Sequence, residues 1–282
     1  MPVAVVTDST AYLPAEVVAT YPVTVVPLTV VIDGVDGREG ADVTPADVVR
    51  ALRHRRASVL TSRPAPEEFA QVYRRLLDGG ADGVVSVHLS AQLSGTVEAA
   101  TLAAAPFGGR VAVVDTRSVG MGLGFPALAA AAVAVRGGDV PAVRGAALAA
   151  VERTSAAFYV DTLEFLRRGG RVSTVAALLG TALSVKPILQ LVDGVIALRD
   201  KVRTTSRALA RLVDVAVEAA GEAEVDVAIH HLDGAQRAQH VATALTERLG
   251  GRLRSRYVIE IGGVVAAHAG PGLVGVVVHR RE

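Results

Sequence analysis

Short apolar runs alternate with amphipathic segments through the first half of the chain. The runs predicted to be strands are 3–6, 23–32 (one strand or two), 83–89 and 110–114. Helix-start signals such as Thr44-Pro45 precede most of the segments between them. The predicted helices are 14–20, 44–55, 64–77 and 94–105. This alternation of strand, loop and helix predicts a parallel, Rossmann-like α/β sheet with helices on both faces.

The pattern changes after about residue 153. Two apolar runs, 183–191 and 195–198, flank Asp193-Gly194, a dipeptide typical of β-hairpins. The other predicted elements are strands at 157–160, 226–230, 257–261 and 275–279, and helices at 162–168, 206–220 and 235–249. We therefore expect an N-terminal α/β domain over residues 1–153. A C-terminal α+β domain with a more antiparallel sheet is expected over residues 154–282, sharing an interface with the first because no long linker separates them.

Charge and composition exclude several classes of protein. The chain has 29 Lys and Arg against 28 Asp and Glu, a balance that argues against a generally basic nucleic-acid binder. Cysteine is absent, so disulfides, thiol nucleophiles and Cys-based metal sites are excluded. The first eight residues lack the basic region of a signal peptide, and we expect a cytoplasmic protein. The uncharged segment 118–135 is rich in Ala and Gly, which favours a buried helix over a membrane span.

Hydroxyl side chains gather at two loops that precede predicted helices. Ser94 and Gly95 open one helix, where free N–H groups favour an anion and a glycine permits close approach of a ligand. Thr61 and Ser62 stand shortly before the other helix. Ordinary helix capping is the alternative explanation for both loops. If both loops follow strands of the parallel sheet, their hydroxyls converge at one edge and predict an anion pocket.

His268 is a third candidate, flanked by small residues and followed by Gly-Pro-Gly. It is suited to donate a hydrogen bond to an anion or to orient a hydroxyl, and a buried structural His is the alternative. No Walker lysine or Gly-x-Ser-x-Gly elbow is present, and the spacing of His230, His231 and His240 matches no metal site. The residues alone thus predict an anion pocket without an evident catalytic pair.

A set of motifs resembles the DegV family, the fatty-acid-binding subunits of bacterial fatty acid kinases, along essentially the whole chain. The motifs are Val6-Thr7-Asp8-Ser9-Thr10, Thr61-Ser62-Arg63-Pro64, Leu93-Ser94-Gly95-Thr96, Val114-Asp115-Thr116, Leu166-Arg167-Arg168-Gly169-Gly170-Arg171-Val172-Ser173 and His268-Ala269-Gly270-Pro271-Gly272. Their order and spacing together are specific. The chain departs from the family at Arg63, where Gln is common, and at Ala267 and Ala269, where Thr is frequent.

The resemblance implies one long-chain fatty acid, buried between or within the domains, and no cofactor. Its carboxylate would be held by the hydroxyls of Thr61 and Ser94, with Ser62, the Gly95 backbone and His268 close by. The chain would not be an enzyme itself. It would present the carboxylate to a separate ATP-dependent fatty acid kinase, which forms an acyl phosphate for phospholipid synthesis.

The resemblance also implies a surface for that kinase. Arg203 matches a basic position implicated in docking, and the run that ends at Arg171 is a second candidate. Transient contact with a membrane surface is compatible with such a protein, and no nucleic acid is expected. Two alternatives remain open at this point. One is a serine-dependent lipid hydrolase or acyltransferase that uses Ser94 and His268, and the other is a regulatory or scaffolding module that holds lipid only structurally.

Overall fold

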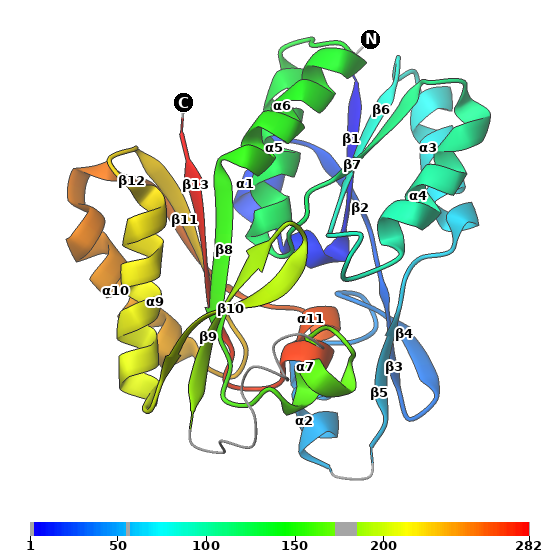
Figure 1. Ribbon diagram of the computed structural model, residues 1–282. Coiled ribbons are helices and arrows are strands. Elements are labelled where there is room, and N and C mark those ends of the chain that lie inside the picture. The colour runs from blue at the N-terminus through cyan, green and yellow to red at the C-terminus, as the bar shows by residue number, and fades with distance from the viewer. Residues whose placement is uncertain (1–2, 55–56, 173–184, 282) are drawn as a thin grey trace.

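Four parallel strands form the first sheet, in the order β2–β1–β6–β7 (Figure 1). The computed structural model describes residues 3–54, 57–172 and 185–281. The strands of this sheet are β1 (Ala4–Asp8), β2 (Val23–Val26), β6 (Val84–His88) and β7 (Val111–Asp115). Every residue of β6 is buried, as expected for an inner strand covered on both faces. The predicted parallel sheet is confirmed, and its carboxyl ends meet at one edge.

Helices cover both faces of this sheet. They are α3 (Pro66–Asp78), α4 (Thr96–Ala104), α5 (Met121–Val135) and α6 (Val140–Glu152), whereas the short helix α1 (Ala15–Thr20) buries none of its residues. Two short 3-10 turns, η1 (Ser9–Ala11) and η2 (Ala105–Phe107), follow β1 and α4. On one face Phe69 and Tyr73 of α3 pack with alanines of α4 against Val6 and Val84. The apolar residues of α5 and α6 fill the other face.

Residues 23–32 form two strands that belong to different sheets. Pro27 separates them, because proline has no N–H group to donate to a neighbouring strand. The second strand, β3 (Thr29–Ile32), lies between β4 (Val35–Arg38) and β5 (Val59–Ser62) in a small antiparallel sheet. Thr61 therefore stands on this separate sheet, and the expectation that its loop follows a strand of the parallel sheet is wrong. Helix α2 (Pro45–Arg53) connects β4 to β5 and begins with a capping box between Thr44 and Asp47.

The third sheet has six strands in the order β10–β9–β8–β13–β11–β12, and only β11 and β12 are parallel. The strands are β8 (Thr154–Tyr159), β9 (Lys186–Val192), β10 (Val195–Val202), β11 (Val225–His231), β12 (Leu253–Glu260) and β13 (Val274–Arg280). Asp193 and Gly194 form the predicted hairpin turn, both with positive φ. The expected start of this hairpin at residue 183 lies outside the described residues. The more antiparallel sheet that was predicted for the second half of the chain is confirmed.

Helix α5 lies between the parallel sheet and the six-stranded sheet (Figure 1). Its alanines pack on the parallel sheet, while Met121 and Phe125 contact Ala228 and Val277 of the other. Burial on both sides explains why segment 118–135 carries no charge. Within the described residues, no helix combines the length and apolarity needed to cross a membrane.

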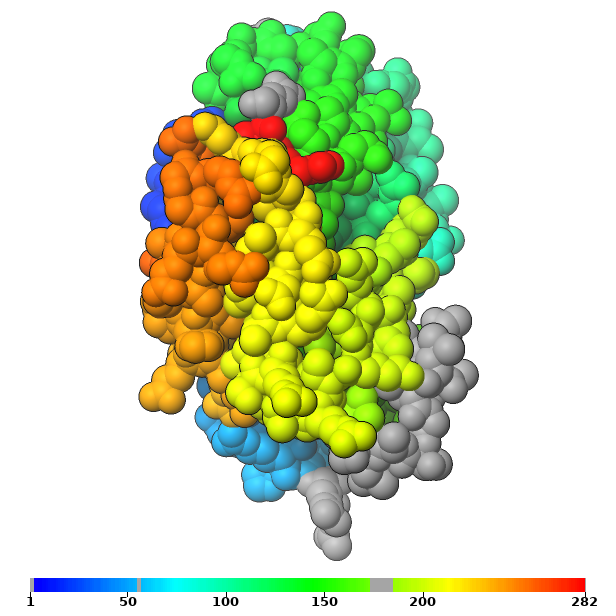
Figure 2. Space-filling view, turned by 60° about the vertical axis from the view of Figure 1, so that its left-hand side comes forward, coloured from blue at the N-terminus to red at the C-terminus, as the bar shows by residue number. Residues whose placement is uncertain are grey.

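The remaining described helices lie in the second half of the chain. They are α7 (Glu164–Arg168), α9 (Thr205–Ala220), α10 (Ala235–Leu249) and α11 (Gly263–Ala269), with the turn η3 (Gly250–Arg252) before β12. Helices α9 and α10 cover the outer face (Figure 2). Helix α11 instead packs against α2 and the three-stranded sheet, where Val264 meets Val30 and Val48 in one core. Residues before and after 153 thus share a core, and the domain boundary there stays a prediction.

Candidate ligand-binding site

A cavity of about 340 Å³ lies where the three sheets meet. Its volume falls within the range of about 300–1,000 Å³ that is typical of small-molecule sites. The walls are mainly apolar. Phe158, Leu191 and Ile196 come from the six-stranded sheet, Val264 from α11, and Leu28 and Leu89 from positions next to β3 and β6. The five residues predicted to bind a carboxylate all line this main cavity: Thr61, Ser62, Ser94, Gly95 and His268.

The polar end of the main cavity is built from three elements far apart in the sequence. Thr61 comes from β5, Ser94 from the loop before α4, and His268 from α11. The Oγ1 atom of Thr61 lies 2.8 Å from Nε2 of His268, and Oγ of Ser94 lies 2.9 Å from Oγ1 of Thr96. The predicted convergence of hydroxyls occurs, although the two loops come from different sheets.

The hydroxyls of this end are not helix caps. Helix α3 has Ala65 at its N-cap position, where the Glu68 carboxylate accepts a hydrogen bond from the Ala65 N–H group at 2.7 Å. Helix α4 has Gly95 at its N-cap position and no side-chain cap. The capping explanation for Thr61 and Ser94 is therefore wrong, and both hydroxyls are available to a ligand in the main cavity.

His268 is held neutral at neutral pH. Burial, together with the nearby charge of Arg171, lowers its pKa to about 4. The ring is also confined on the side away from Thr61, because a Cβ atom added to Gly169 would lie 2.4 Å from Nδ1 of His268. Gly169 thus leaves the space that this imidazole occupies. Since His268 is paired with Thr61 rather than with Ser94, the base–nucleophile pair that a serine hydrolase needs is not formed.

Two arginines flank the polar end. Arg171 lines the main cavity, and its guanidinium donates to the carbonyl oxygens of Leu93 and Gly169. Arg63 forms a 2.5 Å ion pair with Glu98 on the rim. Arg203 does not line the main cavity and is exposed just after β10. A docking role for Arg203 and Arg171 stays a prediction.

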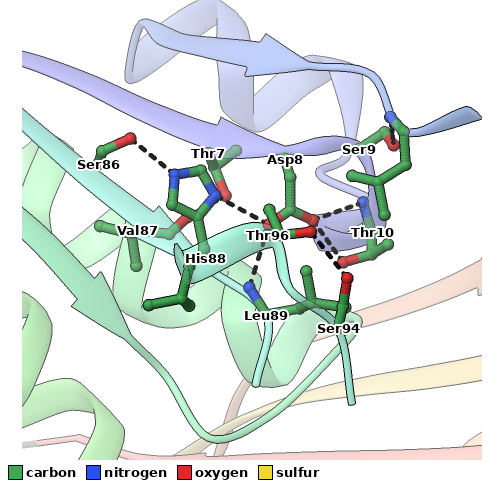
Figure 3. Close-up of polar contacts among 12 residues, drawn as sticks. Thr7, Asp8, Ser9, Thr10, Ser86, Val87, His88, Leu89, Ser94 and Thr96 are labelled. Atoms are coloured by element: carbon green, nitrogen blue, oxygen red, sulfur yellow. Dashed lines mark hydrogen bonds and ion pairs between the residues drawn. The ribbon is translucent and has the colours of Figure 1, made fainter. Parts of the chain in front are cut away.

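A buried polar network holds the loop that carries Ser94 (Figure 3). The Asp8 carboxylate, at the end of β1, accepts a hydrogen bond from the Leu89 N–H group at 3.0 Å and lies 3.0 Å from Nδ1 of His88. Nε2 of His88 lies 2.7 Å from Oγ of Ser86. All three side chains are fully buried and none lines the main cavity. This Asp-His-Ser arrangement is thus closed to a substrate, and it fixes the exit of β6.

Glu39 is a site residue that sequence reasoning missed. Its buried carboxylate accepts hydrogen bonds from the N–H group of Val264 at 2.8 Å, from the Tyr12 hydroxyl at 3.1 Å and from the Ser9 hydroxyl at 2.5 Å. Burial raises the pKa of Glu39. The network fixes the first turn of α11, and hence the helix that carries His268. Glu39 gave no sequence signal because it follows a polar turn, where acidic residues are common.

The main cavity is also lined by a second buried histidine, His230. Nε2 of His230 accepts a hydrogen bond from the Met121 N–H group at 2.9 Å and so caps helix α5 from the other sheet. Burial lowers the pKa of His230 to about 4. Among the described residues no cluster of His, Asp and Glu suited to a metal ion occurs.

Comparison with known proteins places the chain among its relatives. A family model described as "Uncharacterised protein, DegV family" matches residues 2–281. The chain belongs to the DegV family. A DegV domain-containing protein of Streptomyces coelicolor is 52% identical over 279 residues, which cover 99% of each chain. This DegV-family protein therefore has a relative that is similar along its full length.

Solved structures agree with this membership. A DegV family protein from Thermus thermophilus, described as binding fatty acid, superposes on this DegV-family protein with a TM-score of 0.91 and 34% identity, covering 100% of both chains. DegV of Bacillus subtilis, described as a fatty acid binding protein, gives a TM-score of 0.88 and 29% identity, again over 100% of both chains. The predicted family and fold class are confirmed.

Proposed function

We propose that this DegV-family protein binds one long-chain fatty acid non-covalently in the main cavity. The carboxylate would lie among Thr61, Ser94 and His268, with the Ser62 hydroxyl and the Gly95 backbone beside it. The observation that carries the proposal is that these five residues line one cavity whose walls are mainly apolar. The fatty-acid-binding descriptions of similar structures support it.

The energetics of such a complex are favourable. A chain of about 16 carbons buries some 14 methylenes at roughly 0.8 kcal/mol each, or about 11 kcal/mol before the costs of association. The carboxylate cannot be buried without hydrogen bonds. The hydroxyls of Thr61 and Ser94 and a neutral His268 supply uncharged donors, while the guanidinium of Arg171 beside them is engaged with the carbonyl oxygens of Leu93 and Gly169. The carboxylate oxygen would thus remain able to attack a phosphoryl group.

We further infer that a separate kinase uses the bound acid. The carboxylate oxygen would attack the terminal phosphorus of ATP, and ADP would leave with the electrons of the broken P–O bond. This protein would position the acyl group and exclude water from the chain, while the kinase would hold the nucleotide. The product, an acyl phosphate, is an activated acyl donor suited to phospholipid synthesis.

Native mass spectrometry followed by lipid extraction tests the binding step. One exchangeable, non-covalent fatty acid per chain is expected, and the Thr61→Ala/Ser94→Ala double variant should lose it. Thr101→Ala is the matched control, because it removes an exposed hydroxyl of α4 that only bonds within its own helix. A mass without lipid that also takes up no added fatty acid would overturn the proposal. A covalent acyl adduct on Ser94 would establish the hydrolase alternative instead.

The presentation step needs its own assay. Loaded protein, ATP and a candidate kinase are mixed, and acyl phosphate is trapped with hydroxylamine. Formation of acyl hydroxamate that depends on all three components is expected. If bound fatty acid is present but no kinase of the same cell uses it, the chain is a module that holds lipid structurally.

A further inference from the structure

A second cavity, the side cavity, lies against helix α9 on the outer face of the six-stranded sheet. Its volume is about 210 Å³, and Figure 2 shows the face on which α9 lies beside the β9–β10 hairpin. The side cavity and the main cavity share four lining residues: Ala156, Ala157, Leu191 and Val276. The two cavities therefore adjoin each other through the sheet.

The sheet is open at that point because two strands separate. Strand β8 pairs with β9 at only three positions, and the pairing ends at Ala157 and Gln190. Beyond it the hairpin tip is fastened to the parallel sheet instead, since the Ser90 hydroxyl donates to the Gly194 carbonyl at 2.7 Å and Arg117 lies 3.7 Å from Asp193. The hairpin thus pairs with β8 only at its base, while its tip contacts the loops that follow β6 and β7.

Small side chains keep the opening free. Ala156 and Ala157 are consecutive residues of β8, so their side chains point to opposite faces of the sheet. A larger residue at either position would fill the space between the cavities. On the far side Val215, Ala216 and Ala219 of α9 present apolar walls to the side cavity. The ion pair of Arg199 and Glu218, at 2.8 Å, forms its polar rim.

We propose that the side cavity binds the methyl end of long acyl chains, which reach it from the main cavity between β8 and β9. This inference rests on the proposed function. An apolar hole of about 150 Å³ in another protein holds a benzene molecule, so the larger side cavity has room for several methylenes. Each methylene that it buries should strengthen binding about fourfold. The protein would therefore discriminate between fatty acids at the end remote from the carboxylate.

A chain-length series tests this subsite. Lauric, palmitic, stearic, arachidic and behenic acids are bound to the wild-type protein and to Ala219→Leu, which fills the side cavity but does not touch the main cavity. Affinity for the longest acids should fall at least tenfold in Ala219→Leu, while affinity for lauric acid should not change. Ala210→Leu, at an exposed position of the same helix, is the control. An unchanged length profile in Ala219→Leu overturns the inference.

A cross-link provides a measurement that does not depend on filling the cavity. The chain contains no cysteine, so Ala219→Cys introduces a single thiol. Stearic acid that carries a –S–S–CH₃ group at its far end should exchange with this thiol, so that a protein–lipid disulfide forms and methanethiol leaves. Excess unmodified stearic acid should prevent this cross-link. Ala210→Cys should not react above background. If the wild-type protein binds palmitic acid but neither variant cross-links selectively, the side-cavity inference fails while the proposed function stands. If no fatty acid of any length binds, the proposed function itself fails.

Discussion

Replacing Gly169 by alanine should weaken ligand binding through His268 alone. Gly169 has a φ of −73°, a conformation that alanine adopts without strain. The added Cβ would lie 2.4 Å from Nδ1 of His268, whereas ordinary contacts begin at 3.4 Å. The imidazole must therefore move by about 1 Å, the difference between these two distances. A shift of that size breaks the 2.8 Å contact with Thr61 and misplaces the donor offered to the carboxylate.

The expected magnitude follows from the hydrogen bonds lost. A neutral hydrogen bond contributes about 1 kcal/mol and one to a charged group about 1.5–3 kcal/mol. Fatty acid Kd should thus rise about 10- to 100-fold, as measured by calorimetry with palmitic acid. The Gly169→Ala/His268→Ala double variant should bind like His268→Ala, because the two changes act through one side chain.

Two results would refute this reasoning. The first is a Gly169→Ala protein that binds as tightly as wild type. The second is a Gly169→Ala effect that persists at full size when His268 is already alanine. Gly145→Ala serves as the control, since nothing lies within 4 Å of the added Cβ. It should leave Kd unchanged and raise stability by about 0.5–1 kcal/mol, because glycine is unfavourable inside helix α6.

Three further predictions concern titratable groups. A bound carboxylate should raise the pKa of His268 from about 4, so that fatty acid binding takes up protons and becomes tighter as the pH falls from 7 toward 5. Calorimetry in two buffers of different ionisation enthalpy measures the proton uptake. The variant His268→Asn should abolish it. Burial keeps the pKa of His230 near 4 against about 6.5 in the unfolded chain, so stability should be complete above pH 6.5 and fall by about 3 kcal/mol as the pH drops to 4. Urea unfolding at both pH values checks this, and a His230→Gln protein with the same pH slope would contradict it. Glu39→Gln should lower stability by about 1–3 kcal/mol and weaken fatty acid binding. Its amide keeps one oxygen for Val264 and Tyr12, but it turns an N–H group toward the Ser9 hydroxyl, which in the wild-type protein donates to the second carboxylate oxygen. Thermal unfolding and Kd measure both effects, and Asp36→Asn, an exposed change, should alter neither.

Local patterns sufficed for most elements and for the choice of residues that prove to line the main cavity, while their role in carboxylate binding stays a proposal. The hairpin at Asp193-Gly194 was predictable because only a few residue types accept two successive positive φ angles. Thr61 and Ser94 could be singled out because each is a hydroxyl residue shortly before a predicted helix, α3 or α4. The separate sheet that carries Thr61 could not be predicted, since the pairing of β3 with β5 joins strands that are distant in sequence. Glu39 was missed for the same reason, because Val264, whose N–H group donates to it, lies 225 residues away in sequence. The contact of Ser90 with Gly194, 104 residues away, was likewise not predictable.

The position of β13 within the six-stranded sheet constrains how the protein folds. Strand β13 lies between β8 and β11, although residues 274–280 are synthesised after all the other strands. Until those residues are available, no strand links β8, with its partner β9, to β11, with its partner β12. The apolar faces beneath α9 and α10 remain incomplete until then. The sheet therefore closes only once residues 274–280 are available, by pairings of high sequence separation, and such pairings form slowly. Deletion of residues 274–280 would thus divide the sheet in two, rather than trim its edge.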